Sequence, residues 1–167
     1  MTIDKIIVVC NDDDGSVADI CQEESVGISQ YKPPKRNLLS EFWHANLWDD
    51  NDLIVRITAD CPLLESQEID SVVKSHIEKC ADYSYNRCDD TENQEQGEGR
   101  DVEVFTGRAL KTAYETATND YDKEHCTPFF RKGDFLVNKT PTPKGIGLSL
   151  NTKEDYSKIL EIINGYT

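Results

Sequence analysis

Residues 53–86 read LIVRITADCPLLESQEIDSVVKSHIEKCADYSYN, and this stretch decides the fold. It opens with an apolar, β-rich run, residues 53–57, which predicts a buried strand. Pro62 has no backbone N–H and prevents further regular pairing, so we expect Asp60 just past the carboxyl end of that strand. Open α/β sheets bind their ligands at such strand ends, and the position suits a metal or phosphate ligand.

The second half of the stretch predicts a helix that covers the sheet. Apolar residues recur at helical spacing along one face of it: Ile69, Val72, Val73, Ile77 and Cys80. His76 falls on the same buried face. A strand, an acidic loop and a helix therefore follow one another, which is the repeating pattern of an α/β fold.

Strand and helix signals alternate along the rest of the chain as well. Residues 6–10 predict a buried parallel strand, and residues 102–105, 135–137 and 146–150 predict later strands. Helices are expected after four capping residues, Ser16, Thr106, Asp122 and Thr152, the last of which forms a capping-box pattern with Asp155. Another helix is expected over Leu38, Leu39, Phe42, Trp43 and Ala45.

Three further expectations concern the faces of these helices and the segments between elements. The first helix should turn Ala18, Ile20 and Cys21 inward, and the last should do the same with Tyr156, Ile159, Leu160 and Ile163. Residues 32–36 read as a rigid basic linker. Residues 87–100 read as a mobile loop, because Cys88 is their one apolar residue.

Composition limits the class of partner. With 167 residues and a net charge of −14, we expect a single domain whose surface repels nucleic acid and anionic lipid headgroups. An anionic nucleotide is also repelled unless a cationic loop or a divalent metal neutralises it. No apolar run is long enough to cross a membrane and no basic leader follows Met1, so a soluble cytoplasmic protein is expected.

The cysteines and histidines exclude two kinds of site. The six cysteines fall at irregular intervals without a Cys-x-x-Cys pair, so they form no zinc framework. Three disulfides are the alternative, but reduced thiols are favoured because Cys10 and Cys80 lie on apolar faces. The chain has no Gly-x-Ser-x-Gly motif to accompany its three histidines, so a hydrolase triad has no support.

Six motifs in order carry a resemblance to a known family: IDKIIVVCNDDD (3–14), VRITADCP (55–62), ADYSYN (81–86), GRDVEVF (99–105), EHCTP (124–128) and LSLNTKEDY (148–156). They resemble the cytidylyltransferases that activate sugar acids, in particular the type named for spore-coat polysaccharide biosynthesis. Acylneuraminate and ketodeoxyoctulosonate enzymes are related to that type. The resemblance implies a nucleotide-diphosphosugar transferase-like α/β fold, with a mainly parallel sheet and helices on both faces.

The chain departs from this family in two places. Family members begin with a strand and an Arg-x-x-x-Ser-x-Arg-Leu-Pro-x-Lys loop that wraps the nucleotide, and these 167 residues contain no such segment. We therefore expect residues 1–167 to form a domain truncated at its N-terminus, lacking about 30 residues. In addition, the family's Asp-Thr-x-x-Asp reads here as Asn151-Thr152-Lys153-Glu154-Asp155.

The resemblance implies a Mg²⁺ site held by Asp60 and Asn151, which are also the predicted catalytic residues. Mg²⁺ commonly takes one or two carboxylates, substrate phosphates and water, and Asn151 offers an uncharged carbonyl oxygen. The alternative is that Asp60 caps its loop by accepting backbone N–H bonds, as many Asp residues in turns do. Asp155 is read as a helix cap rather than a ligand.

By the same resemblance, Asp101, Glu103, Glu124 and His125 face the sugar acceptor. The alternatives are an outward strand position for Glu103 and a surface imidazole for His125. One interpretation of Lys32, Lys35 and Arg36 is a substitute phosphate site. The favoured interpretation is that they are simply part of the exposed linker.

Two functions remain open at this point. The first is a cytidylyltransferase that moves CMP from CTP to a sugar acid for surface polysaccharide or glycan synthesis, expected to be inactive as this isolated chain. The second is a degenerate, non-catalytic module that binds sugars or acts as a scaffold. Because a missing strand leaves a sheet edge uncovered, we also expect a homo-oligomer or a partner that supplies the N-terminal segment.

Overall fold

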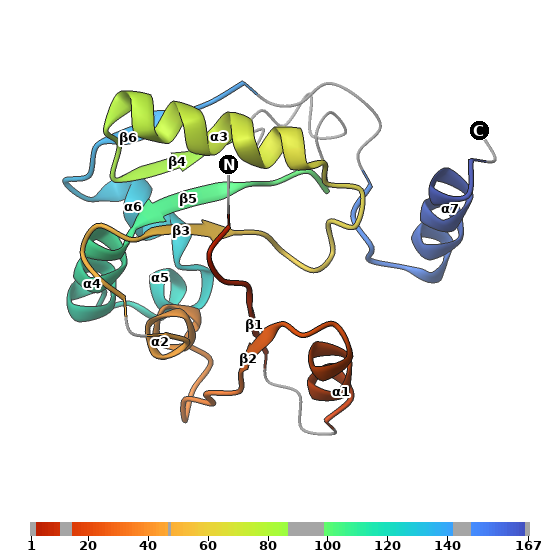
Figure 1. The fold of residues 1–167 in the computed structure, drawn as a ribbon. Helices are drawn as coiled ribbons and strands as arrows, with labels where there is room; N and C mark the ends of the chain where they lie inside the picture. Colours follow the sequence, from red (N-terminus) through yellow and green to blue (C-terminus); the bar gives the residue numbers. More distant parts are fainter. Residues whose placement is uncertain (1–2, 11–14, 47, 87–98, 142–147, 166–167) are drawn as a thin grey trace. The chain divides into compact units, whose positions relative to one another are not determined.

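The computed structural model describes residues 3–10, 15–46, 48–86, 99–141 and 148–165 and has an α/β architecture (Figure 1). The chain forms two compact units that alternate along the sequence. The helical unit contains residues 1–52 and 106–135, and the sheet unit contains residues 53–105 and 136–167. The expectation of a single domain stays a prediction. So does the mobile loop expected at residues 87–100, of which residues 87–98 lie outside the described residues.

The sheet unit is built on four strands in the order β3-β5-β4-β6. Their bounds are β3 Leu53–Arg56, β4 Tyr83–Tyr85, β5 Glu103–Thr106 and β6 Val137–Lys139. β4 runs parallel to β6, with Tyr83 opposite Val137, and antiparallel to β5, with Tyr83 opposite Phe105. The sheet is therefore mixed, and its antiparallel pair is the one that brings residues 99–103 back beside β4.

Helix α3, Ser66–Lys79, packs on one face of this sheet (Figure 1). Val72 and Val73 form a buried cluster with Val102 and Val104, and burying each such side chain contributes roughly 1.5–3 kcal/mol. The predicted helix is confirmed, but its buried stripe is narrower than expected. Ile77 is 54% exposed and Cys80 is the exposed left-handed residue that ends the helix.

Two predicted features at the end of the chain need correction. The expected strand at residues 135–137 is shifted to β6, and residues 148–150 are not in a strand, whereas residues 146–147 lie outside the described residues. Helix α7, Lys153–Ile163, has the predicted capping box of Thr152 and Asp155. Its apolar side chains are mostly exposed, however: Ile159 is buried, but Tyr156, Leu160 and Ile163 are not.

The helical unit begins with β1, Ile7–Val9, which pairs in parallel with β2, Gly27–Ser29. β1 confirms the predicted strand, although it is only half-buried. The sequence did not predict β2, because Gly27 and Ser29 carry no strand signal. Helix α1, Ser16–Glu23, lies between them; it begins after Gly15, buries Cys21 and leaves Ile20 58% exposed, contrary to expectation.

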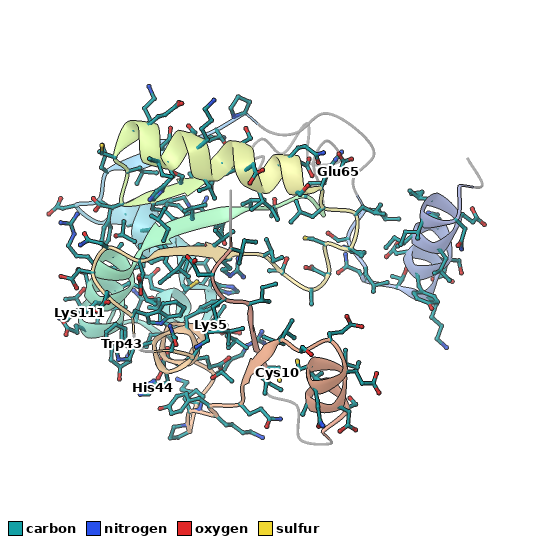
Figure 2. The ribbon with its side chains drawn as sticks, in the orientation of Figure 1. Lys5, Cys10, Trp43, His44, Glu65 and Lys111 are labelled. Atoms are coloured by element: carbon teal, nitrogen blue, oxygen red, sulfur yellow. The ribbon has the colours of Figure 1, made fainter. Side chains whose placement is uncertain are left out.

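The remaining helices of this unit are α2 Leu38–His44, α4 Gly107–Thr116, α5 Asp120–His125 and α6 Thr127–Lys132. α2 packs against α4 and α5. The rings of Trp43 and Tyr114 stack at a centroid distance of 5.3 Å, and Figure 2 shows Trp43 and His44 on α2. Thr106 caps α4 as predicted, by accepting from the Ala109 N–H.

One prediction about α5 is wrong. Its cap is Asn119, which accepts from the Asp122 N–H, so Asp122 is not the cap but a buried residue in the first turn. The basic segment at residues 32–36 is tied to this helix by ion pairs of Lys35 with Asp120 and of Arg36 with Glu124. Because these pairs are exposed to solvent, each is expected to add little to stability.

The sheet unit contains one very close approach between backbones. Gly99 has a φ of +73°, and a Cβ atom there would lie 2.5 Å from the carbonyl carbon of Leu148. We predict that Gly99→Ala lowers the free energy of unfolding by at least about 2 kcal/mol, since it adds a clash to a strained backbone. Urea unfolding of the 167-residue chain measures this change.

The control is Gly165→Ala, because Gly165 has a φ of +75° but a Cβ added there would meet no atom within 4 Å. It carries the same backbone strain without the clash, and should cost only about 1 kcal/mol. Equal losses in the two variants would contradict the close approach at residue 99.

A second prediction concerns His76, a residue of helix α3 that is only 2% exposed. Its Nδ1 lies 2.9 Å from the Ser84 hydroxyl oxygen, which also accepts from the Asn138 amide at 3.2 Å. Burial lowers the pKa of His76, although Asp82 opposes this shift. The folded protein therefore keeps His76 neutral at a pH where the unfolded chain, with an ordinary pKa of about 6.5, takes up a proton.

Stability should therefore fall as the pH drops through about 6.5, because the unfolded state binds more protons than the folded state. From pH 7.5 to 5.5 this histidine removes up to about 1.4 kcal/mol of unfolding free energy. His76→Gln should flatten that part of the pH profile, whereas His44→Gln, at an exposed position, should not. An unchanged profile in His76→Gln would sink the idea.

Candidate functional site

Three motif segments meet in the sheet unit: residues 57–65 after β3, residues 99–101 before β5, and residues 148–152 before α7. We call this meeting point the loop junction. Its central contact is a main-chain hydrogen bond in which the Leu150 N–H donates to the Asp60 carbonyl at 2.9 Å. This bond places Asn151 one residue from a direct contact with Asp60. Asp60 and Asn151 therefore lie in one region, and their role as metal ligands stays a prediction.

Cys61 connects residues 99–101 to the Asp60 loop. Its sulfur is hydrogen-bonded to the backbone of Asp101, lies 3.1 Å from the Thr58 hydroxyl, and donates to Asp60 Oδ1 at 3.6 Å. Burial raises the pKa of the Cys61 thiol, and the nearby charges of Asp60 and Asp101 raise it further. The thiol therefore stays protonated at neutral pH, and two carboxylates lie beside it.

Asp155 has a structural role next to Asn151. Its Oδ2 accepts from the Thr152 N–H at 2.9 Å and from the Asn151 N–H at 3.2 Å. The hydrogen bond from the Thr152 side chain is the main cause of a lowered pKa for the Asp155 carboxyl. This carboxylate is engaged in capping α7, which confirms the cap interpretation. Asn151 itself is exposed, and its described hydrogen bonds involve its main chain.

The N-terminus of α3 is closed by its own acidic residues. Glu65 and Glu68 form a reciprocal capping box, and the Glu65 N–H donates to Glu68 Oε2 at 2.9 Å. Figure 2 shows Glu65 at this end of the helix. A helix N-terminus that follows an acidic loop is otherwise suited to phosphate. Here two carboxylates occupy it, so we do not place a triphosphate there.

Arg100 neutralises these two carboxylates. Its guanidinium Nη2 lies 2.9 Å from Glu65 Oε1, and its Nε lies 2.7 Å from Glu68 Oε1. The Nε–H is not aimed along the second contact, which is therefore an ion pair without a good hydrogen bond. The Arg100 carbonyl in turn accepts from the Asn86 amide at 3.0 Å, and Asn86 Oδ1 accepts from the Val102 N–H at 2.8 Å.

Sequence reasoning missed Cys61, Arg100 and Asn86 as residues that build this region. All three lie inside the quoted motifs, which was the available signal. Arg100 and Glu65 are 35 residues apart in the sequence, and Cys61 is hydrogen-bonded to the still more distant Asp101, so no local pattern reveals these contacts.

Glu103 is buried on β5, with 6% exposure, so the alternative of an outward strand position is wrong. Its Oε1 accepts from the Tyr83 hydroxyl at 2.6 Å, and its Oε2 is paired with Arg56. This carboxylate is already satisfied by residues of the sheet. Its predicted contact with a sugar acceptor stays a prediction.

Glu124 and His125 belong to the helical unit, whereas Asp101 and Glu103 belong to the sheet unit. Glu124 is paired with Arg36 at 3.5 Å. His125 is exposed, and its ring centroid lies 4.7 Å from that of Tyr121. Their predicted role at the acceptor also stays a prediction.

The donor set at the loop junction fits Mg²⁺ better than a transition metal. Among the described residues no group of three or more His, Cys, Asp or Glu side chains is arranged to hold a metal. Mg²⁺ does not need such a group, because it keeps water and takes phosphate oxygens from a substrate. The carboxylates of Asp60 and Asp101 with the Asn151 amide oxygen are the hard oxygen donors it prefers.

The comparisons with known proteins concern the family and the fold of the chain. A family model described as cytidylyltransferase matches residues 1–159. An uncharacterized protein of Methanocaldococcus jannaschii is 30% identical over 169 residues, which cover 96% of this chain and 66% of that protein. The 3-deoxy-manno-octulosonate cytidylyltransferase of Acinetobacter baumannii is 36% identical over 70 residues, which cover 40% of this chain and 28% of that enzyme.

A solved cytidylyltransferase structure from Leptospira borgpetersenii serovar Hardjo-bovis has the same fold, with a TM-score of 0.76 and 21% identity. The match covers 96% of this chain and 68% of that one. The predicted nucleotide-diphosphosugar transferase-like α/β fold is therefore confirmed.

The chain spans about two thirds or less of the length of the relatives it matches. No helix in the described part of the chain is long and apolar enough to cross a membrane. Because the family model covers residues 1–159 of 167, the chain belongs to the cytidylyltransferase family.

Proposed function

We propose that this chain takes part in transferring CMP from CTP to a sugar acid, in the synthesis of a surface polysaccharide or another glycan. The observation that carries the proposal is the hydrogen bond between Leu150 and Asp60, which joins two family motifs at one point. CTP is a cytoplasmic metabolite, so a cytoplasmic location is part of the proposal.

In this reaction a hydroxyl group of the sugar acid attacks the α-phosphate of CTP and pyrophosphate leaves. Such transfers are accelerated mainly by alignment of the reactants and by stabilisation of charge. We assign Asp60 and Asn151 to hold Mg²⁺, which when bound would neutralise part of the triphosphate charge. Among the carboxylates that the family motifs predict at the acceptor, Asp101 is the one that belongs to the loop junction, on its third segment.

Charge makes this metal central to the proposal. The chain carries −14, and both proposed substrates are anions. Arg100 and Arg56 are already paired with glutamates. Lys35 and Arg36 are paired with acidic residues of α5. A bound divalent cation is therefore the means by which the loop junction would accept a triphosphate.

A second candidate function is a non-catalytic member of the family that binds a sugar or acts as a scaffold. The observation that favours it is Asn151, which stands where the family motif has a carboxylate. An amide contributes an oxygen but no charge, and so binds Mg²⁺ more weakly. The two functions differ in whether Mg²⁺ binds specifically at Asp60.

We predict that Asn151→Asp increases Mg²⁺ affinity about tenfold, because it restores a carboxylate beside Asp60. Asp60→Asn should abolish specific binding. Isothermal titration of Mg²⁺ into each 167-residue variant measures both effects. Glu154→Gln is the matched control, because it removes an exposed carboxylate in the first turn of α7 that is not assigned to the metal. Equal, negligible heats in the first two variants would favour a capping role for Asp60.

We also predict that the 167-residue chain by itself releases no pyrophosphate from CTP. A triphosphate brings about four negative charges to a protein of charge −14, and these residues contain no Arg-x-x-x-Ser-x-Arg-Leu-Pro-x-Lys segment to receive them. Adding that segment, fused or in trans, should restore nucleotide binding before it restores rate. The measurement is pyrophosphate release with CTP and a panel of sugar acids. Release by the chain alone that is lost in Asp60→Ala would overturn the prediction.

A further inference from the structure

Arg100 contacts the acidic end of α3 from a buried position. Its side chain is 9% exposed and lies within 2.9 Å of Glu65 and 2.7 Å of Glu68. Both glutamates are at the start of α3 and follow Asp60 by five and eight residues. Arg100 therefore fixes the far end of the loop that begins at Asp60.

The two neighbours of Arg100 hold the other parts of the loop junction. On one side, Gly99 packs directly against the Leu148 backbone, two residues before the Leu150 contact with Asp60. On the other side, the Asp101 backbone is hydrogen-bonded to the Cys61 sulfur. Residues 99–101 thus touch both segments that carry the proposed metal ligands.

The charges explain why the guanidinium is needed. Glu65 and Glu68 carry like charges, each accepts from the backbone N–H of the other in the capping box, and the Glu68 side chain is only 11% exposed. A buried carboxylate that loses its cation is strongly destabilising, and it regains contact with water if the helix end and its loop move outward. The loop that would move carries Asp60.

We propose that Arg100 is the positioning residue of the metal site: by clamping Glu65 and Glu68 it holds Asp60 next to Asn151. This inference rests on the proposed function. It assigns to Arg100 no contact with the metal or the substrates. The clamp acts through the main chain and through the first turn of α3.

The sign of the effect on Mg²⁺ separates positioning from simple electrostatics. Removing a cation near a metal site leaves the site more negative, which by charge alone should strengthen Mg²⁺ binding. If Arg100 positions Asp60, then Arg100→Gln should instead weaken Mg²⁺ binding, by about tenfold, which is typical for loss of an outer-shell partner. Titration of Mg²⁺ into the folded 167-residue variant measures this.

Two further variants test the ion pair itself. Arg100→Lys keeps the charge but not the planar fork, and should lose less affinity than Arg100→Gln. The double variant Arg100→Gln with Glu68→Gln also removes the buried Glu68 carboxylate that would otherwise lack a cation. Its affinity for Mg²⁺ should therefore be no lower than that of Arg100→Gln alone. Lys74→Gln is the control, because it breaks the Lys74–Glu78 pair on the same helix, away from the junction. It should leave Mg²⁺ affinity unchanged.

The outcomes distinguish this inference from the function on which it rests. If Asp60→Asn does not change Mg²⁺ binding, the proposed function fails. If Asp60→Asn abolishes binding but Arg100→Gln binds Mg²⁺ as well as or better than wild type, the positioning role alone fails. Should Arg100→Gln not fold, a double-mutant cycle of Arg100→Lys and Glu68→Gln replaces it: effects on Mg²⁺ affinity that are coupled support the positioning role, and effects that are independent overturn it.

Discussion

The candidate site depends on one main-chain hydrogen bond, from the Leu150 N–H to the Asp60 carbonyl. It connects the segment after β3 to the segment before α7, which are far apart in the sequence. Because both groups belong to the backbone, the contact does not depend on which side chains these residues carry. The bond requires only that both segments are held in place, and the surrounding residues provide this. Gly99 allows the Leu148 backbone to approach, and the Cys61 sulfur holds the Asp101 backbone.

Two largely buried arginines shape the same end of the sheet unit through their ion pairs. Arg100 is paired with Glu65 and Glu68, and Arg56 is paired with Glu103, which also accepts from Tyr83. Buried pairs of this kind add little net stability, because desolvation offsets most of the attraction, but breaking one is costly. Their contribution here is geometric. A chain with 18 basic residues against 32 acidic ones uses two of its arginines to fix loops and strands, and these cations are then not available to a phosphate.

The sequence predicts the elements whose signals are local. The strand before Asp60, helix α3, the Thr106 cap and the Thr152–Asp155 capping box all lie within short windows, and the structure has each of them. What the sequence could not predict depends on distant partners. Glu103 looks like a surface residue until Arg56 and Tyr83 are placed beside it. The apolar periodicity of α7 predicts a buried face, yet Tyr156 and Ile163 are exposed, because periodicity gives the face of a helix but not its partner.

The hydrogen bonds at residue 151 are made by its main chain and do not depend on its side chain. The Asn151 main-chain N–H donates to Asp155, and its neighbour Leu150 makes the contact with Asp60. An amide in place of a carboxylate at residue 151 therefore disturbs none of the described bonds that build the loop junction. Shape and charge at this site are set by different groups: shape by backbone, glycine, a thiol and a buried arginine, and charge by Asp60, Asp101 and residue 151. An intact loop junction is therefore common to both proposed functions. The strength of the proposed metal site decides between the two proposed functions.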